Sequence, residues 1–162
     1  FSPDHPEAHF QYLSEGANKA GRSLSDLDLC VSARIEIGED VEAMIDRRRP
    51  AVAFNMGGMG SADTNFYNDA YRRGGFEEEA KLVQRLWVER ERDKAIAAVP
   101  DELILQTNFL GTVPEVTQRV RAYQAAGINV LRVQPEGADT QERLDSLGQI
   151  IDIVGGINKE TA

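Results

Sequence analysis

The sequence predicts an α/β fold in which about three parallel strands alternate with helices. Segments with strand character occur at 27–37, 106–110 and 128–134, and apolar residues at helical spacing lie between and after them. Strands that alternate with helices of this length typically form parallel βαβ units, so we expect strands that are parallel and adjacent in chain order. A sheet of only three parallel strands leaves its edges open, which indicates part of a larger α/β architecture.

The first helix and the first strand have clear signals. Ser2-Pro3 can start a helix that Gly21 ends. The segment 27–37 alternates, with apolar side chains at odd positions from Leu29 onward, which is the period of a strand. The polar side of this strand carries Cys30, Ser32, Arg34 and Glu36.

A second helix is expected from Asp40 to Pro50, because Asp40 is a favourable cap and proline interrupts helical hydrogen bonding. Its last turn holds the basic run 47–49. We interpret this run as a solvated helix end rather than a binding patch, since cations are favourable near helix C-termini.

The segment 55–76 is rich in glycine, with Gly57, Gly58 and Gly60 within four residues. Such a cluster suggests unusual dihedrals or close backbone approach, which an anionic ligand can use beside a helix start. A helical corner without a ligand explains the same pattern. Because 55–99 has no convincing strand pattern, we expect a helical excursion outside the strand layer. Its candidate contacts at an active-site mouth or a dimer interface are Phe66, Tyr67 and Tyr71.

The remaining elements are ordered along the second half of the chain. A long helix is expected from Glu77 to about Glu91, with Trp87 in its apolar stripe. After the short strand at 106–110, the residues from Thr112 to Glu115 form a capping box that starts the next helix. The strand 128–134 follows, and we expect the last helix to end before Gly155, with a frayed tail at 157–162.

Composition excludes several classes of protein. The net charge of -9 disfavours binding to nucleic acid or anionic lipid. No apolar run approaches the roughly 20 residues that a membrane helix needs. One cysteine, Cys30, cannot form an internal disulfide, and with His5 and His9 it offers too few ligands for a structural zinc site. A cytoplasmic protein without a metal site is therefore expected.

Three segments together resemble a known family. They are GGMGSADTNFYNDAYRRGGFEEEA, then AAVPDELI, then LGTVPEVTQRVRAYQAAGINVLRVQP. In this order they resemble the C-terminal half of luciferase-like oxidoreductases, and most closely the branch that uses the deazaflavin coenzyme F420 and is related to methylenetetrahydromethanopterin reductases. The resemblance extends from Phe1 to the last helix.

The resemblance implies a (β/α)8 TIM barrel of about 250 residues or more, of which 1–162 would be the last strands with a helical insertion at about 55–99. It implies an oxidoreductase or monooxygenase that uses coenzyme F420 or, alternatively, FMN. The residues against the reactive ring belong mainly to the first strands of such a barrel, so we assign no catalytic residue here. By itself, the chain is expected to be inactive.

Residues at the carboxyl ends of the strands are the candidates for binding the cofactor's anionic tail. Arg34 and Arg132 could serve because guanidinium groups suit phosphate and carboxylate, although internal ion pairs would explain them equally well. Gly111 and Thr112 open a helix whose backbone N–H groups could hold a phosphate, although a plain helix cap is favoured. Gly57, Gly58 and Gly60 are the remaining candidates for binding this anionic tail.

Two functions of different classes remain open. In the first, the intact parent is an oxidoreductase acting on a small-molecule substrate, which combines this part with the other half of the barrel and forms a homodimer. In the second, the chain is a non-catalytic α/β module that binds a partner through its open sheet edge.

Overall fold

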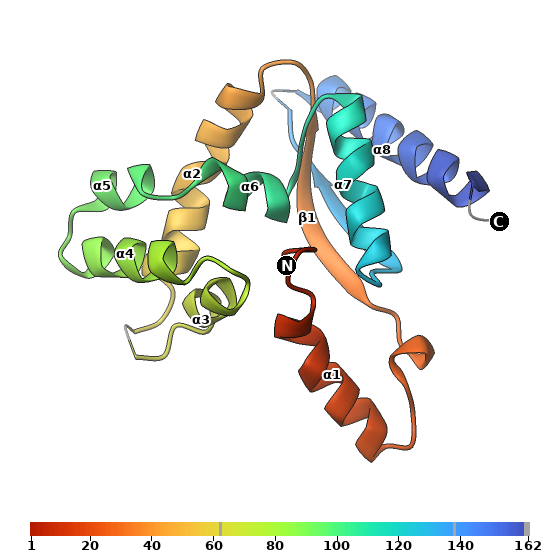
Figure 1. Ribbon diagram of the computed structural model, residues 1–162. Coiled ribbons are helices and arrows are strands. Elements are labelled where there is room, and N and C mark those ends of the chain that lie inside the picture. Colours follow the sequence, from red (N-terminus) through yellow and green to blue (C-terminus); the bar gives the residue numbers. More distant parts are fainter. Residues whose placement is uncertain (62, 138, 161–162) are drawn as a thin grey trace.

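The computed structural model describes residues 1–61, 63–137 and 139–160 (Figure 1). The elements are α1 (Glu7–Lys19), a 3-10 turn (Leu24–Asp26), β1 (Cys30–Ile37), α2 (Val41–Gly57), α3 (Phe66–Arg73), α4 (Glu77–Val88), α5 (Arg92–Ala97), α6 (Asp101–Thr107), β2 (Phe109–Gly111), α7 (Val113–Ala125), β3 (Val130–Pro135) and α8 (Thr140–Glu160).

The three strands form one parallel sheet, as predicted, but their order is β2-β1-β3. β3 pairs along β1 from Cys30 to Ile35, whereas β2 pairs only with the carboxyl end of β1, from Ile35 to Ile37. The expectation that all strands are adjacent in chain order is therefore wrong for β3. A three-residue β2 offers too short an edge for β3, while the eight-residue β1 has two usable edges.

One face of the sheet is covered by α7 and α8. Figure 1 shows these helices together on one side of β1. The apolar side chains of β1 pack there, and Ile35 is completely buried beside Val116 and Tyr123. The alternation predicted for β1 is confirmed, because Cys30 and Ser32 on the other face are exposed. The polar face of the sheet is consequently left for ligands or for further chain.

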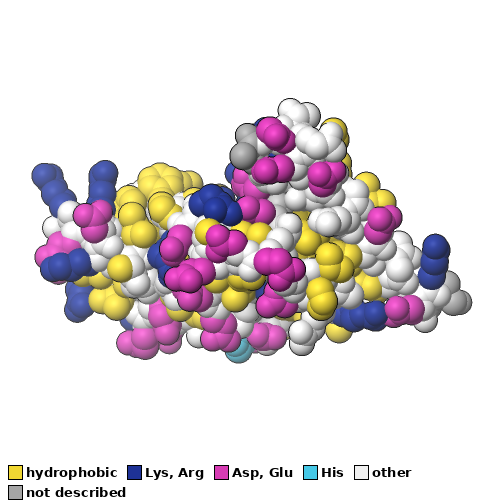
Figure 2. Space-filling view, turned by 90° about the horizontal axis from the view of Figure 1, so that it is seen from above, with side chains coloured by type: hydrophobic (Ala, Val, Ile, Leu, Met, Phe, Trp, Pro, Cys, Tyr) yellow, Lys and Arg dark blue, Asp and Glu magenta, His cyan; other side chains and the backbone are white. Residues whose placement is uncertain are grey.

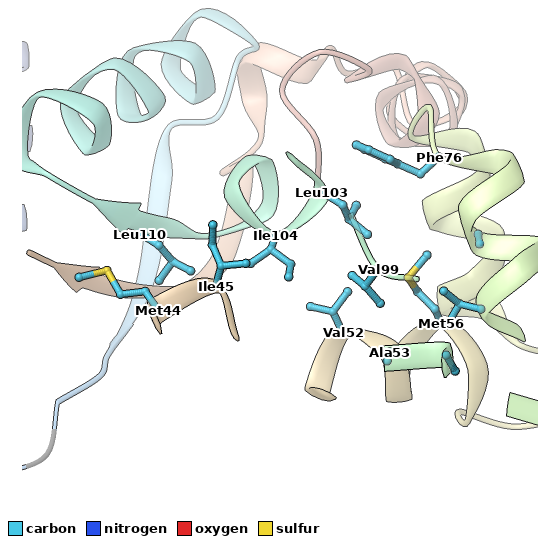
Figure 3. Close-up of a cluster of buried hydrophobic side chains, with 13 residues drawn as sticks. Met44, Ile45, Val52, Ala53, Met56, Phe76, Val99, Leu103, Ile104 and Leu110 are labelled. Atoms are coloured by element: carbon cyan, nitrogen blue, oxygen red, sulfur yellow. The ribbon is translucent and has the colours of Figure 1, made fainter. Parts of the chain in front are cut away.

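Helices α2 to α6 form a second core beside β2. In Figure 3, the buried side chains of α2, of the segment before α6 and of α6 itself lie together, among them Val52, Met56, Val99 and Leu103. Leu110 of β2 belongs to the same cluster and links it to the sheet. The described residues of 55–99 contain helices and no strand. That this segment is an insertion into a barrel stays a prediction.

Two helices are longer than predicted. α2 continues through Pro50 to Gly57, because the buried residues Val52, Ala53 and Met56 outweigh the roughly 3 kcal/mol that an interior proline costs. α8 continues through Gly155 and Gly156, because Ile157 is buried against the sheet core. The predicted fraying of the tail is wrong up to Glu160, and residues 161–162 lie outside the described part.

The limits of other elements shift by a few residues. α1 begins at Glu7, after Pro6, rather than at Ser2-Pro3. Residues 106–107 belong to α6 rather than to a strand. Among the described residues, no helix has both the length and the low charge needed to cross a membrane.

Candidate functional site

The polar face of the sheet borders a cavity of about 360 Å³. Its walls come from β1, β3, α2, α3 and α6 and from the start of the chain, and they include Arg34, Gln134, Arg48, Asn55, Tyr67 and Tyr71. In α/β sheets, ligands bind in the crevice beyond the carboxyl ends of the strands. Arg34 and Gln134 lie side by side in the second half of β1 and β3, on the approach to those ends, so this cavity is the candidate functional site.

A larger cavity of about 680 Å³ lies between α7, α8 and β3. Its lining is mainly apolar, with Leu131, Leu147 and Ile151 among its residues, and it contains no charged side chain. Because an anion is held most strongly by charged donors, the smaller cavity with its arginines is the better candidate.

Two arginines of the candidate site share one carboxylate, that of Glu136, which follows β3 and lies outside the cavity lining. Arg34 Nη1 donates to Glu136 Oε1 at 2.7 Å, and Arg48 Nη1 lies 3.9 Å from the same oxygen. The burial of Arg48, followed by the positive charge of Arg34, lowers the pKa of Arg48. The group nevertheless keeps its charge, since an arginine in a protein cannot be deprotonated near neutral pH. This cluster therefore carries an excess positive charge in an acidic protein.

Acidic side chains are abundant around this end of the molecule. Figure 2 looks down on the end where the strands finish and shows many Asp and Glu side chains there, with a group of basic side chains among them. A local donor cluster is needed to hold an anion against such a field.

The predicted aromatic contacts border the same cavity. Tyr67 and Phe66 are exposed by 44% and 69%, while Tyr71 is largely covered. Burial raises the pKa of the Tyr71 hydroxyl, and a hydrogen bond from Asn55 and the charge of Arg48 oppose that shift. Tyr71 is therefore a neutral hydrogen-bonding group at physiological pH.

The second predicted arginine lies on the same face but outside the cavity. Arg132 pairs in register with Ser32, two residues before the Arg34–Gln134 pair. Its side chain is exposed. Arg34 forms an internal ion pair, as the alternative interpretation expected, and its partner is Glu136. Binding of an anionic tail by either arginine stays a prediction.

The glycine cluster has a clear packing role. A Cβ atom on Gly57 would lie 2.5 Å from Trp87 Cβ, and one on Gly58 would lie 2.7 Å from Phe54. These two glycines thus allow α2 to approach α4 closely. Gly60 has a φ of 76° and is exposed, which fits a turn. Cofactor binding by these glycines stays a prediction.

The helix start at Gly111 and Thr112 is already capped. The Glu115 carboxylate accepts hydrogen bonds from the Thr112 backbone N–H at 2.8 Å and from its hydroxyl at 2.7 Å. The capping box predicted from the sequence is confirmed. A phosphate at this position would have to displace Glu115, so its binding here stays a prediction.

Sequence reasoning missed Arg48, Glu136 and a pair of buried asparagines. Asn65 and Asn68 donate to backbone carbonyls at the end of α2, and Asn68 also donates to the Ala80 carbonyl of α4. These bonds fix the glycine-rich corner. The strand alternation could have placed Glu136 just beyond the carboxyl end of β3. No group of three potential metal ligands occurs among the described residues.

Comparisons with known proteins agree with this architecture. The sequence model of the family described as luciferase-like monooxygenase matches residues 1–129. A Mycobacterium tuberculosis protein described as a "putative coenzyme F420-dependent oxidoreductase" is 31% identical over 149 residues, which cover 91% of this chain and 43% of that protein. The 5,10-methylenetetrahydromethanopterin reductase of Methanopyrus kandleri is 27% identical, over 85% of this chain and 38% of the reductase.

A solved structure supports the same relationship. The coenzyme F420-dependent tetrahydromethanopterin reductase from Methanopyrus kandleri matches with a TM-score of 0.65 and 25% identity, over 91% of this chain and 41% of the reductase. This match confirms the predicted fold class, part of a TIM barrel. The chain spans about two fifths of the length of the curated relatives it matches. It belongs to the luciferase-like monooxygenase family.

Proposed function

We propose that this chain is part of an oxidoreductase that uses coenzyme F420 and acts on a small organic substrate. The observation that carries the proposal is the cavity on the uncovered polar face of the sheet, where Arg34 and Arg48 face a single carboxylate. A phosphate-bearing cofactor needs such donors. Membership of the family and the names of two relatives support redox chemistry and this cofactor.

The proposal includes a division of labour within the whole enzyme. The cofactor supplies the hydride chemistry, and protein groups bind and orient it. In this part of the chain we propose Arg34 as the first candidate for the cofactor's anionic tail. The other candidates are Arg132, Gly57, Gly58, Gly60, Gly111 and Thr112. No residue here is assigned as a catalytic acid or base, and the chain alone is expected not to turn over substrate.

The test is a titration of the natural protein that carries this sequence with coenzyme F420 and, separately, with FMN. We expect coenzyme F420 to bind more tightly. Arg34→Ala should weaken its binding by roughly tenfold or more, because removal of a charged hydrogen bond typically costs about 1.5–3 kcal/mol. Arg121→Ala is the matched control, since Arg121 pairs with Glu160 outside the cavity. Preferred binding of FMN, or equal loss in both variants, would contradict the proposal.

The alternative function is partner binding through the sheet edge. Among the described residues, β2 and β3 each have one edge without a neighbouring strand. Light scattering of the natural protein separates the cases. A homodimer that binds coenzyme F420 agrees with the enzyme, whereas an assembly that binds neither coenzyme favours the interaction module.

A further inference from the structure

The cavity contains an arginine whose pairing is incomplete. Only 19% of the Arg48 side chain is exposed, and its Nε atom is buried without a hydrogen-bond partner among the described residues. The Glu136 oxygen with which it forms an ion pair is 3.9 Å away, which is beyond hydrogen-bonding distance. A covered guanidinium that lacks partners loses hydration without full compensation, so a further acceptor would stabilise it.

Glu136 is bound mainly to the other arginine. Its Oε1 atom accepts from Arg34 at 2.7 Å, which leaves Arg48 with a minor share of the negative charge. Because Glu136 is 32% exposed and is not otherwise held by a buried network, it can turn away from Arg48 at little cost. Glu136 therefore offsets only part of the positive charge of Arg48 when no ligand is present, and a ligand anion can take its place.

The rest of the cavity indicates what an incoming ligand would look like. Its volume of about 360 Å³ is at the lower end of the range for small-molecule sites. Tyr71 and Tyr67 lie on α3 and line the same wall, with Val52 and Phe76 nearby. An apolar body of the size of one ring fits this lining. Because the charge of Arg48 is only partly offset by Glu136, an acidic group on that body would complete its pairing.

We propose that Arg48 binds the carboxylate or phosphate group of a small organic substrate whose apolar body lies against Tyr67 and Tyr71, and that Glu136 is the internal counter-ion that this group displaces. The planar guanidinium edge can hold two oxygens of an oxyanion at once, which a lysine cannot do. This inference rests on the proposed function: Arg34 stays the candidate for the cofactor's tail, and Arg48 with the α3 wall forms the substrate part of the same site.

The experiment titrates the natural protein with benzoate, phenyl phosphate and the neutral control benzamide. Calorimetry and the nuclear magnetic resonance signal of the Arg48 Nε–Hε group report binding. We expect benzoate or phenyl phosphate to bind and to shift this signal, and benzamide to bind at least tenfold more weakly. The stronger of the two anions identifies the acidic group as carboxylate or phosphate. Inorganic phosphate, which lacks the ring, should bind more weakly than phenyl phosphate.

Variants of Arg48 and of Glu136 should change the affinity for the anion in opposite directions. Arg48→Ala should weaken binding of the preferred anion by roughly 10- to 100-fold. Arg48→Lys should recover only part of the loss. Glu136→Gln should tighten binding by about threefold or more, because it removes a competing negative charge. Arg121→Ala should leave anion binding unchanged, and the melting temperature of each variant shows whether it folds.

Two results would overturn the inference. One is equal binding of the preferred anion by the wild type and Arg48→Ala, or binding of neither anion by the wild type. The other is unchanged or weaker anion binding by Glu136→Gln, which stays informative even if Arg48→Ala fails to fold. Coenzyme F420 is titrated separately with the wild type. If the wild type does not bind coenzyme F420, the proposed function is rejected. If it binds the coenzyme but substitution of Arg48 leaves anion binding unchanged, only this inference is rejected.

Discussion

Three consecutive arginines have three different environments. Arg47 pairs with Glu36 at the surface, Arg48 lines the cavity, and Arg49 donates to the Val99 carbonyl and to carboxylates. The sequence shows only a basic run, and its interpretation as a solvated helix end is wrong for the last two. Apart from Asp46, one turn before Arg49, their partners lie far away in the chain, and helical periodicity contains no information about such contacts.

Local interactions between residues are more predictable. Thr112 and Glu115 are three positions apart, and their capping box follows from the sequence alone because one helical turn brings them together. The hydrogen bonds from the Thr112 hydroxyl and backbone lower the pKa of the Glu115 carboxyl. Its ionised form therefore stabilises the folded state.

The pH dependence of stability should follow from this lowered pKa. Glu115→Ala should reduce the free energy of unfolding by about 1 kcal/mol near neutral pH. A carboxyl whose pKa is depressed stabilises the fold above its unfolded value of about 4.3, and this contribution is lost as the pH falls through the folded value. The difference between wild type and variant should thus shrink below about pH 4.

Denaturant unfolding from pH 3 to 7 measures this difference, with Asp152→Ala on the exposed side of α8 as the control. A difference for Glu115→Ala that stays constant over the whole range would mean that the charge of Glu115 has no part in the cap.

At the scale of elements, α2 shows how packing replaces local signals. Pro50 and the glycines at its end all predict that the helix stops or loosens, yet it reaches Gly57. The reason is contact with α4: Gly57 and Gly58 leave room for Trp87, and a T-shaped contact joins Phe54 to the same ring at 5.8 Å. The glycine motif was visible in the sequence, but its packing partner was not.

Substitution of a glycine separates packing from ligand binding. Gly57→Ala should lower the free energy of unfolding by about 1–3 kcal/mol, because the new Cβ overlaps the Trp87 side chain. Gly148→Ala should instead raise it by about 0.5–1 kcal/mol, since Gly148 lies inside α8 with no atom within 4 Å of the added carbon. Thermal melting measures both variants. A stable Gly57→Ala protein with weakened coenzyme binding would assign the glycine to the ligand instead.

At the scale of the whole molecule, the sequence was sufficient for the α/β class and the parallel strands. Alternation in β1 and the β-branched residues of β3 are local patterns. The order β2-β1-β3 was not predictable from the assumption that successive strands are neighbours, because it depends on how short β2 is. The site was predicted in part. Arg34 and Tyr71 were candidates from the sequence, and both line the cavity. The contact between Arg48 and Glu136 was not predicted, because it joins segments that are distant in the chain.

The central claim is that the uncovered polar face of this sheet binds the redox cofactor and its substrate. Hydrogen exchange of the natural protein, with and without coenzyme F420, tests it most directly, because it reports where the backbone becomes protected. We expect slower exchange at the carboxyl ends of β1 and β3 and along α2 and α3, with no change in the outer turns of α8. Protection confined to other segments, or none in the presence of saturating coenzyme, would contradict the account.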